Sequence, residues 1–411
     1  MQSKYFLIGL VAFSLACTSK KIDYSSLPDE KLKQVADSLA QAYIIADGHV
    51  DFPSRLKVKN FRLEKEYIGI PIQSEEGDFD YERAKKGGLD APFMSIYIPS
   101  SYQIREDKGK KLADSLINMV NDIVAAHPDK FAAALTPTDI ENNSRQGKLS
   151  LPMGMENGAP IGDDLAGVKY FYDRGIRYIT LTHATDNQIS DSSYDTLNTW
   201  NGLSPFGEQV VKEMNRVGIM VDISHVSDSA FYDVMKLTKV PVIASHSSCR
   251  FFTPGFQRNM SDEMLVALKK NGGVIQINFG STFLDSAVAS QNEENRKKLE
   301  VALNGLDHRD EAAKPILEEF RKSNPSLYAD VETVANHIDR VVQFAGIDHV
   351  GLGSDYDGVG DSLPTGLKDV SQYPNLIFVL LKRGYTPEEI EKICSKNLFR
   401  VWNRVIEAAS L

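Results

Sequence analysis

Short apolar runs alternate along the chain with segments of helical period. Eight runs have the length of buried strands: residues 43–46, 93–98, 151–155, 178–182, 219–224, 240–245, 274–279 and 350–354. Strands that alternate with helices pair in parallel through crossover helices, so the pattern predicts an α/β fold. Eight such units predict a closed (β/α)₈ TIM-like barrel in a single domain, although periodicity alone is also compatible with an open doubly wound sheet.

Several segments between the runs carry helix signals. Residues 29–43 have helical spacing, and residues 205–217 are amphipathic. Residues 261–271 begin with Ser-Asp-Glu and end before a Gly-Gly pair, which is a typical start and stop of a helix. The charged stretch 291–324 is predicted as a solvated helical insertion between the seventh and eighth units. With no internal repeat or low-complexity linker, residues 29–411 are interpreted as one barrel domain.

The N-terminus has the pattern of an export signal. In residues 1–16 Lys4 precedes an apolar stretch that is too short to span a bilayer, and a small residue then precedes Cys17. This resembles a bacterial lipoprotein signal, in which the cysteine becomes the lipidated N-terminus. Residues 17–28 would then be a polar tether, and the protein would be lipid-anchored at the bacterial cell envelope. An ordinary cleaved signal peptide with an incidental cysteine is the alternative.

Composition excludes several classes of protein. The chain has 42% hydrophobic and 25% charged residues, which is ordinary for a globular protein. Its net charge of −10 has the wrong sign for a nucleic-acid partner. Beyond Cys17 the only cysteines are Cys249 and Cys394, so we expect packing roles for them and a metal site built from histidines and carboxylates.

Side chains that can bind metals lie at the ends of six predicted strands. They are His49 and Asp51 after the first run, Glu156 after the third, His183 after the fourth, His225 after the fifth, His246 after the sixth and Asp355 after the eighth. The carboxyl ends of barrel strands converge on one face, where the βα loops build the site. The sequence therefore predicts one pocket that holds a ligand set for two divalent metals.

Taken singly, each of these residues has a simpler explanation. The His-x-Asp pair is common by chance, His225 and His246 fit buried core positions, and Glu156 fits a helix cap. Asp355 lies in a Gly-Ser-Asp-Tyr-Asp-Gly segment that reads as an ordinary turn. Chance gives no reason for all of them to fall at the same end of successive strands, so the joint pattern favours a site.

These residues lie in motifs that resemble the membrane (renal) dipeptidases, which are zinc-dependent barrels of the amidohydrolase type. The motifs occur in the family's order and cover the chain from about residue 44 to 400. They are Asp47-Gly-His-Val-Asp51, Met155-Glu-Asn157, Leu181-Thr-His183, Gly202-Leu-Ser-Pro-Phe-Gly-Glu208, Val221-Asp-Ile-Ser-His225, Ser245-His-Ser-Ser248, Arg258-Asn-Met-Ser-Asp262 and Gly353-Ser-Asp-Tyr-Asp-Gly358.

The resemblance implies two Zn²⁺ ions per chain. The first would be held by His49 and Asp51, the second by His225 and His246, and Glu156 would bridge both. Imidazole and oxygen ligands suit Zn²⁺, and a set without thiolates is typical of a catalytic site left open to water.

The implied activity is hydrolysis of dipeptides, including those with a C-terminal D-residue. Two neighbouring cations lower the pKa of a bridging water and supply hydroxide to the amide carbonyl. Asp355 would carry a proton to the leaving nitrogen and pair with the substrate ammonium. His183 would stabilise the oxyanion, and Arg258 would bind the free α-carboxylate. Clamping both substrate termini would limit substrates to two residues.

The chain also departs from the family pattern. Asn157 replaces a glycine that many relatives have after the glutamate, and Gly280-Ser-Thr282 stands where relatives carry a tyrosine. The substrate preference therefore stays open, and the resemblance leaves a homodimer open as well. Two other functions remain: hydrolysis of another amide, lactam or lactone on the same barrel, or ligand binding by a non-catalytic lipoprotein.

Overall fold

Eight parallel strands form a closed barrel. The structure is a computed structural model, and it describes residues 23–58, 71–103, 107–307 and 310–409. The strand order around the barrel is β1-β10-β9-β8-β7-β6-β5-β2. Because β1 pairs with both β2 and β10, the sheet has no edge, which rules out the open doubly wound alternative. The predicted (β/α)₈ barrel is confirmed.

All eight predicted runs overlap a barrel strand. The strands are β1 (Ile45–Val50), β2 (Leu89–Tyr97), β5 (Met153–Glu156), β6 (Ile176–Thr180), β7 (Met220–Asp222), β8 (Ile243–Ser247), β9 (Val274–Ile277) and β10 (Val350–Leu352). The strands are fully paired in a closed sheet, so runs that are apolar on both faces mark them well. A small parallel pair outside the barrel, β3 (Phe131–Ala132) with β4 (Leu149–Ser150), was not predicted.

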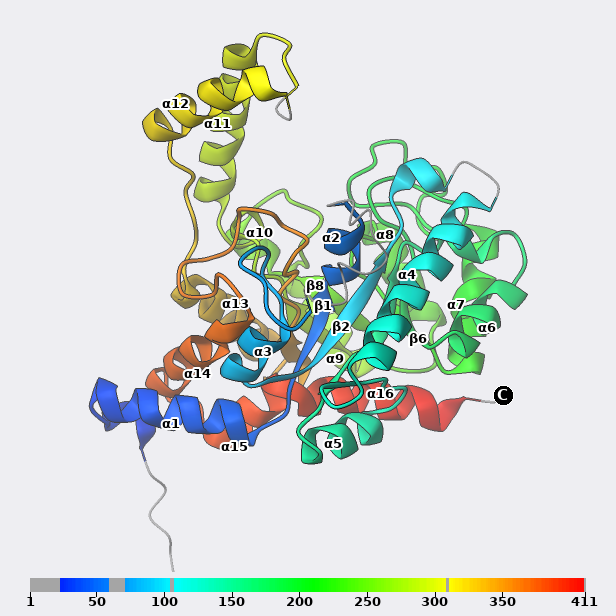
Figure 1. Cartoon of the computed structure of the whole chain (residues 1–411). Helices are drawn as coiled ribbons and strands as arrows, with labels where there is room; N and C mark the ends of the chain where they lie inside the picture. Colours follow the sequence, from blue (N-terminus) through cyan, green and yellow to red (C-terminus); the bar gives the residue numbers. More distant parts are fainter. Residues whose placement is uncertain (1–22, 59–70, 104–106, 308–309, 410–411) are drawn as a thin grey trace, which may run out of the picture.

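Helices surround the barrel in the expected alternation (Figure 1). The α-helices are α1 (Asp29–Ala42), α2 (Phe52–Val58), α3 (Tyr81–Gly87), α4 (Lys108–Ala126), α5 (Pro137–Arg145), α6 (Ala166–Asp173), α7 (Pro205–Val217), α8 (Asp228–Leu237), α9 (Asp262–Asn271), α10 (Ser281–Leu284), α11 (Ser286–Leu303), α12 (Lys314–Ser323), α13 (Val331–Phe344), α14 (Tyr373–Lys382), α15 (Pro387–Glu391) and α16 (Asn397–Ala408). The predicted helix starts are confirmed at two positions, where the Ser204 and Ser261 side chains cap α7 and α9.

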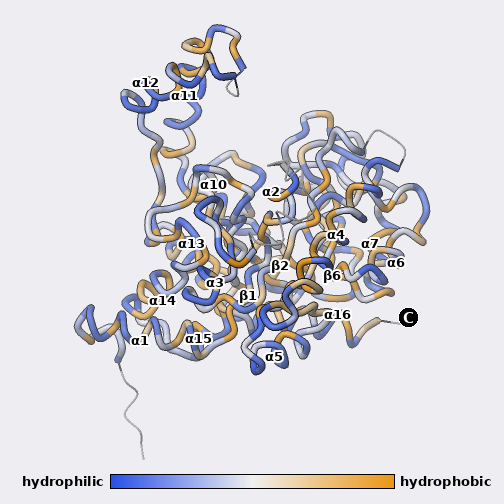
Figure 2. Tube along the Cα trace, in the orientation of Figure 1, coloured by the Kyte–Doolittle hydropathy of each residue, from blue (hydrophilic) through white to orange (hydrophobic). Residues whose placement is uncertain are grey.

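The two ends of the barrel differ in polarity. At the amino end, helix α16 packs against the side chains of Phe93 and Met220, which lie inside the barrel. The α16 residues in this cluster are Leu398, Trp402 and Val405. These contacts close that end with apolar side chains. Figure 2 shows apolar residues along the strands, whereas α11 and α12 carry mainly hydrophilic residues. The predicted site residues lie at the other, carboxyl end, where a barrel fold builds its site.

The charged insertion forms the helical pair α11 and α12 between β9 and β10, as predicted. In Figure 1 it projects away from the barrel, and α12 has no buried residue. Cys249 and Cys394 are buried free thiols, which agrees with packing roles. The predicted signal sequence and Cys17 lie outside the described residues. Among the residues that are described, no helix is both long and apolar enough to cross a bilayer.

Burial of His337 on α13 predicts a loss of stability in acid. Its Nδ1 accepts a hydrogen bond from the Cys249 amide at 2.9 Å, and its Nε2 lies 2.9 Å from the Leu284 carbonyl. Burial lowers the pKa of His337 from 6.5 to about 4, so between these values the proton binds the unfolded chain preferentially. The free energy of unfolding should therefore fall by about 3 kcal/mol as the pH drops through this window.

A His337→Asn variant isolates this contribution, since asparagine retains an acceptor for the Cys249 amide. Urea unfolding of metal-free protein at several pH values between 4 and 7 measures it. The variant should show a shallower pH dependence than the parent protein. Equal slopes would contradict the assignment.

Candidate active site

The predicted site residues gather at the carboxyl end of the barrel. His49 and His246 are the penultimate residues of β1 and β8, and Glu156 is the last residue of β5, so these side chains belong to the strands themselves. Asp51 directly follows β1, whereas His183, His225 and Asp355 each lie three residues beyond their strands. The structure therefore brings together the seven residues that follow the predicted strands.

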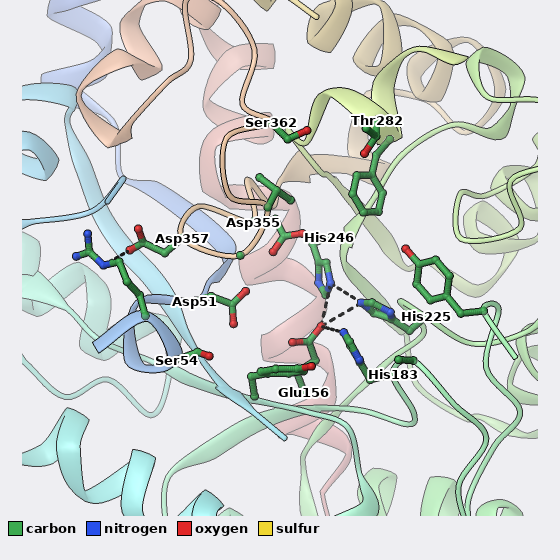
Figure 3. Close-up of a pocket in the computed structure, with 17 residues that line it drawn as sticks. Asp51, Ser54, Glu156, His183, His225, His246, Thr282, Asp355, Asp357 and Ser362 are labelled. Atoms are coloured by element: carbon green, nitrogen blue, oxygen red, sulfur yellow. Dashed lines mark hydrogen bonds and ion pairs between the residues drawn. The ribbon is translucent and has the colours of Figure 1, made fainter. Parts of the chain in front are cut away.

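All of these residues except His49, which is fully buried behind them, line a cavity of about 900 Å³ (Figure 3). Its walls include Asp51, Glu156, His183, His225 and Asp355. In Figure 3 their side chains point toward one another from different strands and loops. The volume suits a small organic ligand of a few residues at most.

Glu156 stands at the centre of the group. Its Oε1 lies 3.0 Å from His225 Nε2 and 3.2 Å from His246 Nε2. Its other oxygen, Oε2, lies 3.5 Å from His49 Nε2, which is itself 3.3 Å from Asp51 Oδ2. The two carboxylate oxygens thus face two different sets of side chains.

The donor set fits divalent cations. Three groups place their ligand atoms within 4.8 Å of one another: His49 with Asp51 and Glu156, Glu156 with His183 and His225, and His49 with His246 and Asp355. His49 Nε2 and Asp51 Oδ1 are buried, and neither has a hydrogen-bond partner among the described residues. Buried polar atoms without partners are costly, and a bound cation would satisfy them.

The electrostatics leave most of these groups in the form that binds a metal, although Tyr178 and the neighbouring carboxylates outweigh burial and raise the pKa of His49 well above 6.5. Burial, together with the charge of Arg258, holds the pKa of His225 well below its usual range, and burial, His49 and Arg258 do the same for His246. Burial alone would raise the pKa of Glu156, but the surrounding histidines lower it well below 4.5. Neutral imidazoles and an ionised carboxylate are the forms that bind metals.

Asp355 is set up differently from Glu156. Burial raises the pKa of Asp355, His49 lowers it, and the charges of Asp51 and Glu156 raise it further. The net result is a pKa of about 7. Asn278 donates a hydrogen bond from Nδ2 to Asp355 Oδ2 at 2.7 Å. A carboxyl group that titrates near neutrality suits proton transfer.

The backbone around the site is strained. His225 and Asp355 have φ values of 67° and 63°, in the left-handed region that is uncommon for residues other than glycine, although Asp and His adopt it more often than most. Such conformations cost about 1 kcal/mol or more and cluster at functional sites. Gly358 is required by crowding, since a Cβ there would lie 2.3 Å from the carboxylate oxygens of both Asp51 and Asp355.

His183 and Arg258 hold different positions. His183 borders the cavity with its Nε2 3.7 Å from Glu156 Oε1, and burial lowers its pKa, so it is a neutral hydrogen-bond donor. Arg258 is buried and is not among the residues that line the cavity. Its guanidinium donates to Ser247 Oγ and to the His246 carbonyl, both at 2.6 Å, while its Nε has no partner among the described residues.

Sequence reasoning missed several residues of the site. Tyr97, the last residue of β2, borders the cavity with its ring 4.8 Å from that of His183. Its position at the end of a strand could have indicated a site residue, but Tyr97 lies inside the apolar run 93–98 and therefore resembles a core residue. Tyr194 also borders the cavity, 5.8 Å from the His225 ring. It lies on the long irregular segment between β6 and α7, where no periodicity points to it. Asn278, just after β9, was missed as well.

Comparison with known proteins agrees with this geometry. The family model described as membrane dipeptidase (peptidase family M19) matches residues 33–410. The chain belongs to the membrane dipeptidase family. Members of this family are metallopeptidases that hydrolyse dipeptides, and the chain is an enzyme of this class. The resemblance inferred from the motifs is thus confirmed.

Individual relatives support the same conclusion. The chain is 31% identical to dipeptidase 3 of Mus musculus over 381 residues, which is 92% of this chain and 67% of the relative. The probable dipeptidase PvdM from Pseudomonas aeruginosa has a similar structure, with a TM-score of 0.78, 25% identity and coverage of 92% of this chain and 100% of that one. A Rhodobacter sphaeroides metallopeptidase, liganded with a phosphinate mimic of the dipeptide L-Ala-D-Ala, gives a TM-score of 0.73 at 25% identity and covers 88% of this chain and 99% of that one.

Proposed function

We propose that this metallo-dipeptidase works with two Zn²⁺ ions. His49 and Asp51 would hold one ion, His225 and His246 would hold the other, and Glu156 would contribute to both. The main support for the proposal is that the two oxygens of the Glu156 carboxylate face different side chains. Oε2 faces His49, and Oε1 faces His225 and His246. Imidazole and carboxylate ligands without thiolates suit catalytic zinc.

When bound at these residues, the ions would supply an activated water and polarise the scissile carbonyl. The chain's own residues would transfer the proton and stabilise the oxyanion. Asp355, held by Asn278, accepts a proton from the attacking water and passes it to the leaving nitrogen. His183, which is neutral, donates a hydrogen bond to the developing oxyanion.

The proposed substrates are free dipeptides, including those with a C-terminal D-residue. The similar Rhodobacter sphaeroides enzyme is liganded with a mimic of L-Ala-D-Ala, which supports this chirality. Asp355 faces the substrate ammonium, and Arg258 attracts the carboxylate through the N–H groups that Ser247 and His246 leave free. Amino-acid release from L,L- and L,D-dipeptides, a tripeptide and end-blocked dipeptides tests this. Equal cleavage of tripeptides would contradict it.

The role of Arg258 can be separated from its structural hydrogen bonds by comparing substrates. The parent enzyme should discriminate against a dipeptide amide, which lacks the carboxylate, by about 2 to 5 kcal/mol in kcat/KM. In Arg258→Ala most of this discrimination should disappear, whatever the general loss of activity. Steady-state kinetics on the dipeptide and its amide give both values. Unchanged discrimination in the variant would remove Arg258 from substrate binding.

One observation favours a second candidate function. Arg258 lies outside the cavity lining, and both of its terminal nitrogens already donate hydrogen bonds within the protein. If it does not bind a carboxylate, the same centre would hydrolyse another amide, a lactam or a lactone. Cleavage of dipeptide amides as fast as dipeptides would favour this alternative.

We also propose that the protein is anchored at the bacterial cell envelope by a lipid on Cys17. The support is the signal-like sequence of residues 1–16 and the membrane association of the family. Metabolic labelling with a radioactive fatty acid tests this, because the parent protein should be labelled and Cys17→Ser should not. A homodimer is a further proposal, which sedimentation of the purified protein would test.

A further inference from the structure

We infer that Tyr178 and Ser245 are positioning residues that fix the tautomers of His49 and His246. Each hydroxyl accepts a hydrogen bond from a histidine Nδ1, so that both Nε2 lone pairs point into the centre. We call each of these hydrogen-bonded pairs a relay. The inference rests on the proposed metal function, because a lone pair aimed at this point is useful only to a bound cation.

The first relay runs through the Tyr178 hydroxyl. It lies 3.0 Å from the Gly48 carbonyl and 2.8 Å from His49 Nδ1. A carbonyl can only accept, so the single hydroxyl proton goes to Gly48. His49 Nδ1 must then donate the second hydrogen bond, so the lone pair of the neutral imidazole lies on Nε2. That Nε2 is the buried atom without a hydrogen-bond partner that faces Glu156 and Asp51.

The second relay runs through the Ser245 hydroxyl. It lies 2.6 Å from Asp222 Oδ2 and 2.8 Å from His246 Nδ1. The Asp222 carboxylate accepts the hydrogen bond that the Ser245 hydroxyl donates, so His246 Nδ1 donates to Ser245 Oγ and Nε2 of the neutral imidazole carries a lone pair. Asp222 is itself held by Thr180 Oγ1 at 2.5 Å and by the Ser245 amide at 2.8 Å. The serine therefore cannot turn away without breaking a buried network.

Both relays direct a histidine Nε2 toward the same small region at the centre of the site. The rings of His49 and His246 lie 3.8 Å apart between centroids, and His246 Nε2 lies 2.9 Å from His225 Nε2. His225 lacks such a relay, since its Nδ1 is buried with no partner among the described residues. Close nitrogens with lone pairs repel unless a proton or a cation lies between them. The relays thus favour a cation at this point over a closed network of hydrogen bonds.

Packing around Tyr178 is an independent observation. A Cβ on Gly154 of β5 would lie 2.0 to 2.3 Å from three atoms of the Tyr178 ring, so only glycine leaves room for it. Phe93 packs against the other part of the ring, with centroids 5.4 Å apart. The barrel interior is therefore built around one position of this phenol, and that position places its oxygen at His49.

A simpler role for both residues is to fill and stabilise the barrel. Metal affinity separates the two roles, because a purely structural residue would change stability without changing the affinity of the folded protein. Tyr356 offers a matched control, since its phenol is also fully buried but donates to backbone carbonyls of Leu367 and Asp369.

The experiment measures the dissociation constants of Zn²⁺ by chelator competition, and the visible spectrum after Co²⁺ loading, in five proteins. These are the parent protein, Tyr178→Phe, Ser245→Ala, Ser245→Thr and Tyr356→Phe. We expect Tyr178→Phe and Ser245→Ala to weaken one ion each by about 10- to 100-fold and to alter the Co²⁺ spectrum. Ser245→Thr, which keeps the hydroxyl, and Tyr356→Phe should match the parent.

The outcomes are distinct. If the parent binds zinc and both relay variants bind it equally well, the relays are structural and the inference is wrong, while the proposed function stands. If the parent binds no metal, the proposed function fails and the inference fails with it. If Tyr178→Phe does not fold, the comparison of Ser245→Ala with Ser245→Thr decides the matter alone.

Discussion

Replacing Glu156 with glutamine should abolish both metal retention and dipeptide hydrolysis. The carboxylate reaches His49 with one oxygen and His225 and His246 with the other. Glutamine keeps the shape but loses the charge and one acceptor oxygen, so it cannot bridge two cations. We expect kcat/KM to fall by about 10⁴-fold or more. Metal content after gel filtration and the rate of amino-acid release measure the two effects.

Glu208→Gln is the matched control for this change. Glu208 lies exposed in the first turn of α7, where loss of its charge should leave activity and metal content unchanged. A Glu156→Gln protein that keeps its metal and its full activity would contradict the assignment of Glu156 as the bridge.

The second large effect is expected for Asp355→Asn. The environment of this carboxyl raises its pKa to about 7, and asparagine removes the titrating proton while keeping the size. We expect kcat to fall by about 10²- to 10⁴-fold, because proton transfer to the leaving nitrogen is lost. The metal content should stay close to that of the parent, since His49, Glu156 and the other predicted ligands remain.

Asp361→Asn serves as its control, because this exposed aspartate follows the same strand and accepts a hydrogen bond from Tyr328. Single-turnover kinetics at saturating substrate separate the chemical step from binding. An Asp355→Asn enzyme that loses affinity for dipeptides but keeps its kcat would show that Asp355 binds the ammonium and does not transfer protons.

Much of the barrel could be predicted from the sequence for a simple physical reason. Strands covered on both faces need apolar residues throughout, so each appears as a short continuous run bounded by polar loops. The polar residues at the ends of such runs then stand out, which is why Asp51, His183 and His225 could be placed together. The helix start at Ser261 was visible because a cap needs a short polar side chain.

Other features depend on contacts that no local pattern encodes. Tyr178 lies within an apolar run, and only its closeness to His49 gives its hydroxyl a role. Ser245 stands beside a predicted ligand, but its link to Asp222 joins strands far apart in the sequence. The direction of Arg258 is a similar case, because its hydrogen bonds to Ser247 and His246 draw it behind the cavity wall.

The measurement that most directly tests the account is a zinc titration of chelator-stripped enzyme, with binding and dipeptide hydrolysis followed in the same samples. We expect no activity without metal and activity that saturates as the second equivalent of zinc is bound. Full activity in the stripped enzyme, or saturation at a single equivalent, would contradict a centre in which Glu156 bridges two ions.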